Sequence, residues 1–415
     1  MFNTLLLKLF SQVVTTDDIA EAHNNGIEHR ITGISVSGLK RTKLRVIERP
    51  LQKFIGTDER DININDVYAI IEDTGILEPV SIEITDNQEE AGKTLAITVR
   101  EKWSIIPSPY FGFDSDNWVV GGAVFDSNAF GLRDAMLVMG TYGKNSWSAM
   151  FMYISTPNTV GDFGFSVGAH VLSQNTEHTE QTGKEVLRRF NTRTISPSFA
   201  LMYSLTELLT PRIGISYRNS VLRDTEDPVN APDDGMQAII ITPGIGMRHT
   251  SWDGYLLGVK SATLRYHYSI VFGGNNVQSL SLDSVFNHSI VPGFRFTAKS
   301  GLQFTFFADE PYFESSPVSA VNILASTYSA AHYAGLSLGL EKYLFRFKYG
   351  TFALAAAYQN VFSRGNLLGN QFDHGPATTL KMYFSRIAVP GIEIGIAYNA
   401  ARDKYRFAFN MSGSF

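Results

Sequence analysis

Apolar and polar side chains alternate residue by residue over most of the chain after residue 103. Within 263–272, Leu264 and Tyr266 share one parity, while Arg265 and His267 share the other. The ranges 213–217, 294–306 and 392–398 repeat this alternation. Successive side chains of a β-strand point to opposite faces, so the pattern predicts strands with one apolar and one polar face.

The alternating segments and the turn residues between them predict sixteen strands. We place these at 107–114, 118–126, 134–142, 147–155, 162–172, 190–204, 212–222, 236–249, 255–271, 277–287, 293–307, 334–346, 350–361, 377–387, 391–399 and 403–413. The long polar connections are 174–188, 223–235, 308–332 and 363–375, and all of them follow odd-numbered strands. Outer-membrane barrels have long loops on one side of the membrane and short turns on the other. The spacing therefore favours a mainly β fold, a 16-stranded antiparallel transmembrane β-barrel.

A soluble β-sandwich is an alternative source of the same alternation, because it packs apolar faces together and wets the outer faces. It gives no reason for long connections to follow odd strands alone. A sandwich binding module would stay in the aqueous fraction, whereas a barrel turns its apolar face to lipid. Outer-membrane lipid is therefore one predicted partner.

Composition divides the chain near Trp103. The first 103 residues hold 29 of the 75 charged side chains and only 5 of the 51 aromatic ones, while the remaining 312 residues hold 46 of each. Transmembrane barrels concentrate aromatic residues in girdles at both interfaces. We therefore expect a water-soluble N-terminal domain at 29–103, with α+β structure, and a barrel at 104–415.

Composition and motifs also exclude several kinds of chemistry. The chain has no Cys, and its formal net charge is −5, which argues against thiol chemistry and against a nucleic-acid partner. Two G-x-S-x-G matches, around Ser166 and Ser337, lie inside alternating strands and lack the strand–turn–helix elbow of a nucleophile. The His residues show no zinc-ligand spacing. We therefore expect no enzyme activity, no catalytic residue, no metal and no cofactor.

Residues 31–103 predict one strand, two helices and two strands. The first strand covers 31–36, a helix capped by Thr42 covers 43–55, and a second helix runs from its cap at Asn65 to Gly75. Pro50 should shorten the first helix. Two strands follow near 79–86 and 94–101.

The stretch from Ile31 to Trp103 resembles a single POTRA domain. Gly121-Gly122-Ala123-Val124-Phe125-Asp126-Ser127-Asn128-Ala129-Phe130-Gly131 resembles the second strand and Asn-x-x-Gly turn of the BamA/TamA-type outer-membrane assembly superfamily, the bacterial surface antigen family. Ser155-Thr156-Pro157 and the C-terminal Phe415 fit the same pattern. The resemblance implies a Gram-negative outer-membrane protein with its POTRA domain in the periplasm. It also implies partners: unfolded or nascent barrel polypeptides, and periplasmic chaperones that reach the POTRA domain.

Two segments depart from this family. Its members carry an Arg-Gly-Phe/Tyr tip on the loop after the eleventh strand and an acidic residue on the thirteenth. Here 308–332 contains no Arg, and 352–360 contains no Asp or Glu. We therefore expect both sides of the contact between the loop Arg and this acidic residue to be missing together.

Residues 1–28, where Leu5-Leu6-Leu7 is cut short by Lys8, are predicted to be an atypical signal or leader segment.

The first and last strands are predicted to form a weak seam. Pro107 and Pro109 remove ladder donors at the start of the first strand, so its pairing with the last strand should be thin at the periplasmic end. The residues assigned to the seam and to pairing with a client strand are Ser108, Tyr110, Phe111, Gly112, Tyr405, Phe407, Phe409, Met411 and Phe415. The residues assigned to the wet lumen are Arg265, His267, Arg295 and Lys299.

The resemblance and the seam together predict a barrel that inserts or translocates polypeptides by opening between its first and last strands. The alternative is a passive porin-like or structural surface barrel that lacks assembly activity. The clients and the oligomeric state are not encoded in any recognisable motif.

Overall fold

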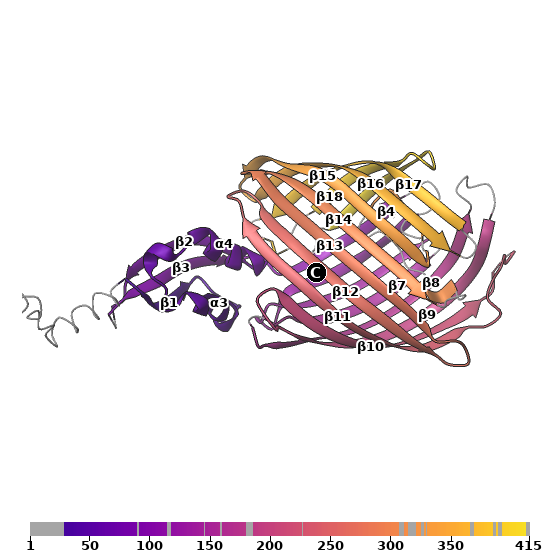
Figure 1. Cartoon of the computed structure of the whole chain (residues 1–415), viewed down its shortest axis with the longest axis horizontal. Helices are drawn as coiled ribbons and strands as arrows, with labels where there is room; N and C mark the ends of the chain where they lie inside the picture. The colour runs from indigo at the N-terminus through magenta and orange to yellow at the C-terminus, as the bar shows by residue number, and fades with distance from the viewer. Residues whose placement is uncertain are drawn as a thin grey trace, which may run out of the picture.

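A computed structural model describes residues 29–88, 91–113, 118–144, 146–157, 160–179, 186–225, 227–306, 311–313, 321–324, 328, 330–365, 369–384, 387–388 and 392–411. The chain is mainly β, with a small three-stranded sheet followed by a large antiparallel sheet of sixteen strands. The small N-terminal domain lies at one end of the large sheet (Figure 1). We call this end of the sheet proximal and the other end distal. No helix in the described part of the chain is long and apolar enough to cross a membrane.

The N-terminal domain has the predicted order of one strand, two helices and two strands. Its main elements are β1 (Ile31–Ser37), α3 (Arg45–Leu51), α4 (Ile64–Asp73), β2 (Leu77–Asp86) and β3 (Lys93–Glu101), with short 3-10 turns η1 (Gln52–Phe54) and η2 (Glu59–Asp61). The central β3 runs parallel to β1 and antiparallel to β2. Both helices contribute to one buried core, where Ile47 and Ile71 pack with Leu95 and Ile97.

The helix starts differ from the prediction. Thr42 does not cap α3; its hydroxyl instead accepts a hydrogen bond from Asn128 in the barrel. Helix α4 is capped by Asn63, whose side chain accepts from the backbone N–H of Asn65, so the predicted cap at Asn65 was wrong by two residues. Pro50 lies in the last turn of α3, which is shorter than predicted because proline cannot continue a helical hydrogen-bond ladder.

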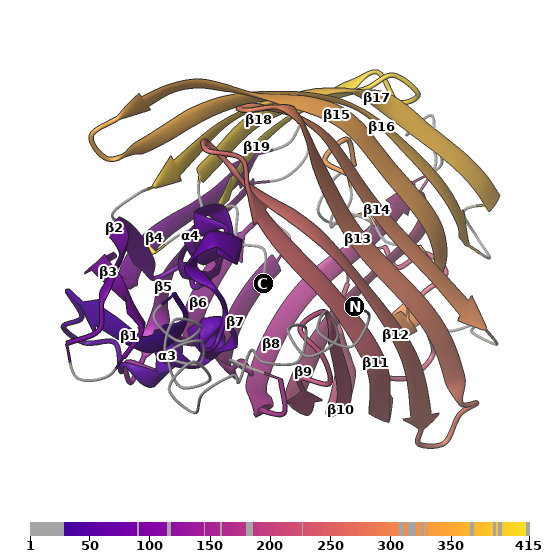
Figure 2. The ribbon, with the colours of Figure 1, turned by 60° about the vertical axis from the view of Figure 1, so that its left-hand side comes forward.

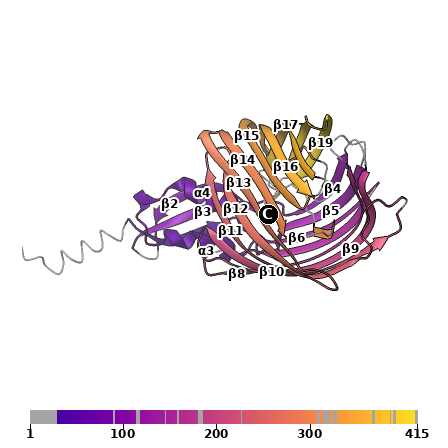
Figure 3. The ribbon, with the colours of Figure 1, turned by 45° about the vertical axis from the view of Figure 1, so that its right-hand side comes forward.

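Sixteen consecutive strands build the large sheet. They are β4 (Ile105–Phe113), β5 (Trp118–Ala129), β6 (Asp134–Gly143), β7 (Ser146–Ser155), β8 (Phe163–Thr179), β9 (Val186–Tyr203), β10 (Leu209–Arg223), β11 (Met236–Trp252), β12 (Leu257–Val271), β13 (Val277–Val291), β14 (Phe294–Phe306), β15 (His332–Phe347), β16 (Gly350–Gly365), β17 (Gly369–Phe384), β18 (Ile392–Asn399) and β19 (Lys404–Met411). The tilted strands wrap around a lumen (Figures 2 and 3). Each predicted strand corresponds to one observed strand, which confirms the period-two interpretation.

Large apolar side chains cover the outside of this sheet. On β10, Ile213 and Ile215 are 55% and 51% exposed, while Arg212 of the opposite parity lines the lumen. Soluble proteins rarely expose contiguous apolar surface of such extent, because water makes it costly. The outer face is therefore suited to lipid hydrocarbon.

Two of the predicted long connections were wrong. β8 and β9 stay paired as far as Thr179 and Val186, and β16 and β17 as far as Gly365 and Gly369, so 174–188 and 363–375 are largely strand. In the distal part of β8, residues 173–179 are all polar, so the alternation that marks the rest of the strand is absent there. A hydropathy pattern cannot distinguish such segments from loops, because the hydrogen bonds that hold them are made by the backbone.

The N-terminal domain is joined to the proximal end of the barrel by several contacts. Arg41 donates to the Asp126 carboxylate at 2.8 Å and to the Ser104 hydroxyl at 2.9 Å. Between β17 and β18, Ile387 pairs with Trp103, and Ala388 packs into the core of the N-terminal domain. The domain is thus attached at points far apart in the sequence.

Glu101 gives this joint a testable pH dependence. Partial burial alone would raise the pKa of Glu101, but hydrogen bonds from the backbone N–H groups of Arg41, Lys40 and Thr42, at 2.7–3.0 Å, outweigh it and lower the pKa below its ordinary value of 4.5. The resulting stabilisation is fully present above pH 4.5 and is lost as the pH falls through the lowered pKa.

We expect Glu101→Gln to destabilise the 38–44 segment by about 1–3 kcal/mol at pH 7, because charge-assisted hydrogen bonds are lost. Amide hydrogen exchange on the full chain should show faster exchange there at pH 7. The matched control is Glu83→Gln, which changes an exposed carboxylate on β2. Equal exchange rates in the Glu101 variant and the wild-type protein at pH 7 would contradict this account.

Candidate functional site

The two ends of the barrel sheet meet at a thin junction. The order of the strands returns on itself because β19 neighbours β4, and Phe407 with Phe113 is the one registered pair between them in the described residues. The same β4 makes nine registered pairs with β5, and β19 makes eight with β18. Phe113 ends β4 at the distal side, so the proximal part of the junction is the weakly paired part.

The predicted seam residues lie on both sides of this junction. Ser108, Tyr110, Phe111 and Gly112 belong to β4 and are in register with β5. Tyr405, Phe407, Phe409 and Met411 belong to β19 and are in register with β18, while Phe415 lies outside the described residues. Pro107 and Pro109 lie in the proximal part of β4, where they offer no N–H to a neighbouring strand. The thin proximal pairing agrees with the expectation from these prolines.

A cavity of about 1900 Å³ occupies the lumen. Three of the four predicted lumen residues, Arg265, Arg295 and Lys299, line it. The fourth, His267, makes hydrogen bonds across the wall, with its Nδ1 3.1 Å from Thr242 Oγ1 and its Nε2 3.3 Å from Ser281 Oγ.

A charged cluster lies on the lumen wall toward the proximal end. The carboxylate of the fully buried Glu341 accepts three hydrogen bonds. They come from Arg295 Nη2 at 2.8 Å, Lys381 Nζ at 3.0 Å and the Tyr383 hydroxyl at 2.6 Å. Lys381 also lies 3.4 Å from Glu393. Two acids face two bases, so the charges of these four groups balance, while Arg295 Nε is buried without a hydrogen-bond partner among the described residues. The sequence analysis identified Arg295 but missed Glu341. In the predicted strand 334–346, Glu341 alternates with apolar residues and so falls on the inward face, which was the signal that could have identified it.

The connection between β14 and β15 enters the lumen and contacts two opposite parts of the wall. Its first contact is the 3-10 turn η3 (Pro311–Phe313), where the Tyr312 carbonyl accepts from Arg218 at 2.9 Å. The Tyr312 hydroxyl donates to the backbone of Asp234 at 2.8 Å. Tyr312 and Phe313 pack on an apolar cluster of β11.

The second contact of this inward loop lies against β16, β17, β18 and β19. Val321, Ile323 and Leu324 are buried against apolar side chains of the wall. Arg406 of β19 donates to the backbone carbonyls of Asn322 and Leu324, and Asn399 donates to that of Ile323. The loop therefore offers backbone oxygens, and the wall supplies the positive charge.

A buried ion pair supports this second contact. Arg402 binds the fully buried Asp373 through Nε at 2.7 Å and Nη2 at 3.1 Å, and it donates to Gln371 at 2.6 Å. The Arg402 guanidinium also lies over the ring of Tyr328, which belongs to the loop, at 5.2 Å from its centroid.

The contact between a loop Arg and an acidic residue at 352–360 is absent, as expected, but the loop nevertheless packs against the wall. The loop has no Arg and 352–360 has no acid, as the sequence shows. However, Arg402 and Arg406 of the wall take the role of the positive group, and Asp373 lies one strand further on, in β17. A search for charge in the loop alone could not find this reversed arrangement.

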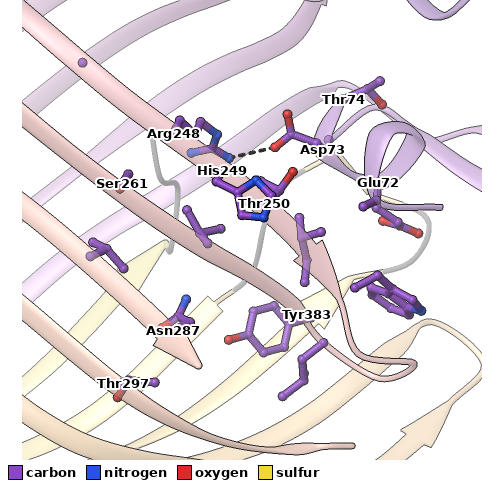
Figure 4. A pocket seen from close by; sticks show the side chains of 18 of the residues that line it. Glu72, Asp73, Thr74, Arg248, His249, Thr250, Ser261, Asn287, Thr297 and Tyr383 are labelled. Carbon is purple, nitrogen blue, oxygen red and sulfur yellow. Dashed lines mark hydrogen bonds and ion pairs between the residues drawn. The ribbon is translucent and has the colours of Figure 1, made fainter. Parts of the chain in front are cut away.

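The N-terminal domain contributes to the proximal mouth of the lumen. Asp73, at the end of α4, accepts from Arg248 of β11 at 3.0 Å (Figure 4). Its backbone carbonyl accepts from Arg133 at 2.6 Å. Glu72 beside it lies 3.0 Å from Lys102. All five residues line the same cavity. The end of α4 is therefore part of the wall of the lumen at its proximal end.

Comparisons with solved structures identify the architecture. CdiB from Escherichia coli superposes with a TM-score of 0.62 at 14% identity, over 93% of this chain and 75% of that one. CdiB from Acinetobacter baumannii superposes with a TM-score of 0.58 at 11% identity, over 92% of this chain and 73% of that one. This chain has the fold of CdiB. BamA from Haemophilus ducreyi lacking POTRA domains 1–3 superposes with a TM-score of 0.49 at 12% identity, over 92% of this chain and 83% of that one.

The resemblance stated from the sequence is thereby supported at the level of fold, since CdiB from two organisms superposes over more than nine-tenths of this chain. No protein-family model and no curated protein matches the sequence. The likeness to CdiB thus lies in the arrangement of the strands rather than in the residues.

Proposed function

We propose that this chain is an outer-membrane barrel that inserts or translocates polypeptides by lateral opening between β4 and β19. The observation that carries the proposal is that β4 and β19 share one registered pair among the described residues, Phe407 with Phe113, whereas they make nine pairs with β5 and eight with β18, respectively. Hydrogen bonds supply the cohesion of a sheet, so this junction is the one that opens at least cost.

In this proposal, the freed edge of β4 is a template for a client strand. An extended polypeptide can add to a sheet edge through backbone hydrogen bonds. Ser108, Tyr110, Phe111 and Gly112 provide that edge on β4. The N-terminal domain acts as a POTRA domain in the periplasm and receives unfolded barrel polypeptides or their chaperones. No covalent chemistry is part of the mechanism.

The lumen favours this function over a passive porin. The inward loop contacts opposite walls through Arg218 and Arg406, and Asp73 of α4 is held at the proximal mouth by Arg248. A porin needs an open aqueous channel. Elements tethered inside the lumen by hydrogen bonds instead narrow it.

Insertion kinetics test the proposal. Purified protein in liposomes should speed the membrane insertion of an unfolded eight-stranded barrel by about tenfold or more, which corresponds to about 1.4 kcal/mol of barrier. Insertion is followed by the appearance of the folded, heat-modifiable form. Liposomes that contain an unrelated porin at equal density are the control. Insertion no faster than in that control, together with a large single-channel conductance, would favour the porin.

A further inference from the structure

The lumen is positively charged although the chain as a whole is acidic. The side chains that line the cavity include eleven Lys and Arg but seven Asp and Glu. The formal net charge of the whole chain is −5. The excess of cations is therefore concentrated inside the barrel, where low-dielectric walls strengthen electrostatic fields.

Most of the cavity's cations have carboxylate partners. Arg295 and Lys381 share Glu341, and Arg265 Nη1 lies 2.7 Å from Asp283 Oδ2. Arg212 and Lys299 have no ion pair among the described residues, and Arg212 Nε is buried without a hydrogen-bond partner. Both side chains line the cavity. A buried, unpaired guanidinium nitrogen is costly unless a ligand satisfies it.

These cations form a track across the wall. Arg212 of β10 is in register with Gly244 of β11, which is in register with Arg265 of β12. Because Gly244 has no side chain, the stems of both arginines approach it, each with Cγ 3.4 Å from the place where a Cβ would be. Lys299 follows on β14, two strands beyond Arg265. Four strand spacings of about 4.8 Å separate Arg212 from Lys299 across the sheet, and Lys299 lies four residues along β14 from Gln303, the position level with Arg265, so the track spans about 23 Å.

We propose that the track Arg212–Arg265–Lys299 binds an extended acidic segment of a polypeptide in the lumen. Its length fits a chain of several carboxylates better than one small anion, since an extended chain covers about 3.3 Å per residue. The choice of a polypeptide as the source of the carboxylates rests on the proposed function. Arg212 supplies the unpaired guanidinium, Arg265 shares its charge between Asp283 and the ligand, and Lys299 supplies a third cation.

The experiment measures binding of fluorescein-labelled decaglutamate to the full chain in detergent by fluorescence anisotropy. Wild-type protein should bind decaglutamate in low salt, and fluorescein-labelled decalysine, measured separately, should not bind. Arg212→Gln/Lys299→Gln should weaken binding about tenfold and reduce its salt dependence. Arg212→Lys/Lys299→Arg, which keeps both charges, should bind like the wild type.

The matched control is Arg223→Gln/Lys348→Gln, which removes the same charge from exposed positions at the distal end of β10 and in the proximal turn before β16. Heat-modifiable mobility in gels shows that each variant is folded. Equal loss of binding in the control and the lumen variant would overturn the proposal. Competition by pyrophosphate as effective as that by decaglutamate would also overturn it, because a small anion would then suffice. Since the assay uses no membrane, its failure is distinguishable from failure of the insertion activity.

Discussion

A disulfide between cysteines at positions 113 and 407 is expected to reduce client insertion to the rate of protein-free liposomes, and reduction of the disulfide should restore it. Phe113 and Phe407 are the registered pair of the β4–β19 junction. Directly opposed residues of antiparallel strands have Cα atoms about 4.5–5.5 Å apart, which a disulfide spans without distortion. Since the chain has no Cys, the engineered pair has no competitor. The covalent bond prevents the lateral opening that the proposed function requires.

The control for this experiment shares one substitution with the test. Phe407 is also in register with Ile396 of β18, within a ladder of eight pairs. Ile396→Cys/Phe407→Cys therefore places a disulfide on the other side of the same residue, where no opening is proposed. We expect its insertion rate to be equal under oxidising and reducing conditions. If the protein locked at 113 and 407 inserts clients as fast as its reduced form, lateral opening is not the mechanism.

The barrel could be predicted from the sequence because its strands repeat one local rule. The prediction of a strand at 212–222 corresponds to β10 (Leu209–Arg223), since lipid outside and water inside impose opposite polarity on successive residues. The rule fails where successive residues of a strand are all polar, as at 173–179. Thr179 and Val186, at the tip of the β8–β9 hairpin, were predicted to lie in a loop for this reason.

The contacts of the inward loop could not be predicted, because they depend on which strands meet in space. Asp373 and Arg402 are 29 residues apart, and Arg406 reaches Leu324 over 82 residues. The alternation in 403–413 does place Arg406 on the polar face, opposite Tyr405 and Phe407. Its partner, however, is a backbone carbonyl, and every residue has one, so the sequence contains no signal for the choice.

The Asp373–Arg402 pair has the largest expected effect on the inward loop. Asp373→Asn leaves the Arg402 guanidinium without its counter-charge, and removal of one partner of a buried ion pair costs about 3–5 kcal/mol. We expect a lower unfolding midpoint of the barrel and rapid amide exchange at 321–324. Single-channel conductance should rise, because this loop segment is then free to leave the lumen. Asp224→Asn, which alters an exposed carboxylate, should change none of these.

A second variant separates the anchoring of the loop from the stability of the barrel. In Asp373→Leu/Arg402→Met, apolar side chains of similar size replace both charges, a change that is often neutral for stability. The unfolding midpoint should then return close to that of the wild type. The exchange at 321–324 should stay fast, since Tyr328 has lost the guanidinium on which it stacks at 5.2 Å. Recovery of slow exchange in this variant would show that apolar packing of Val321, Ile323 and Leu324 is sufficient to hold the loop. The ion pair would then stabilise the barrel wall without anchoring the loop.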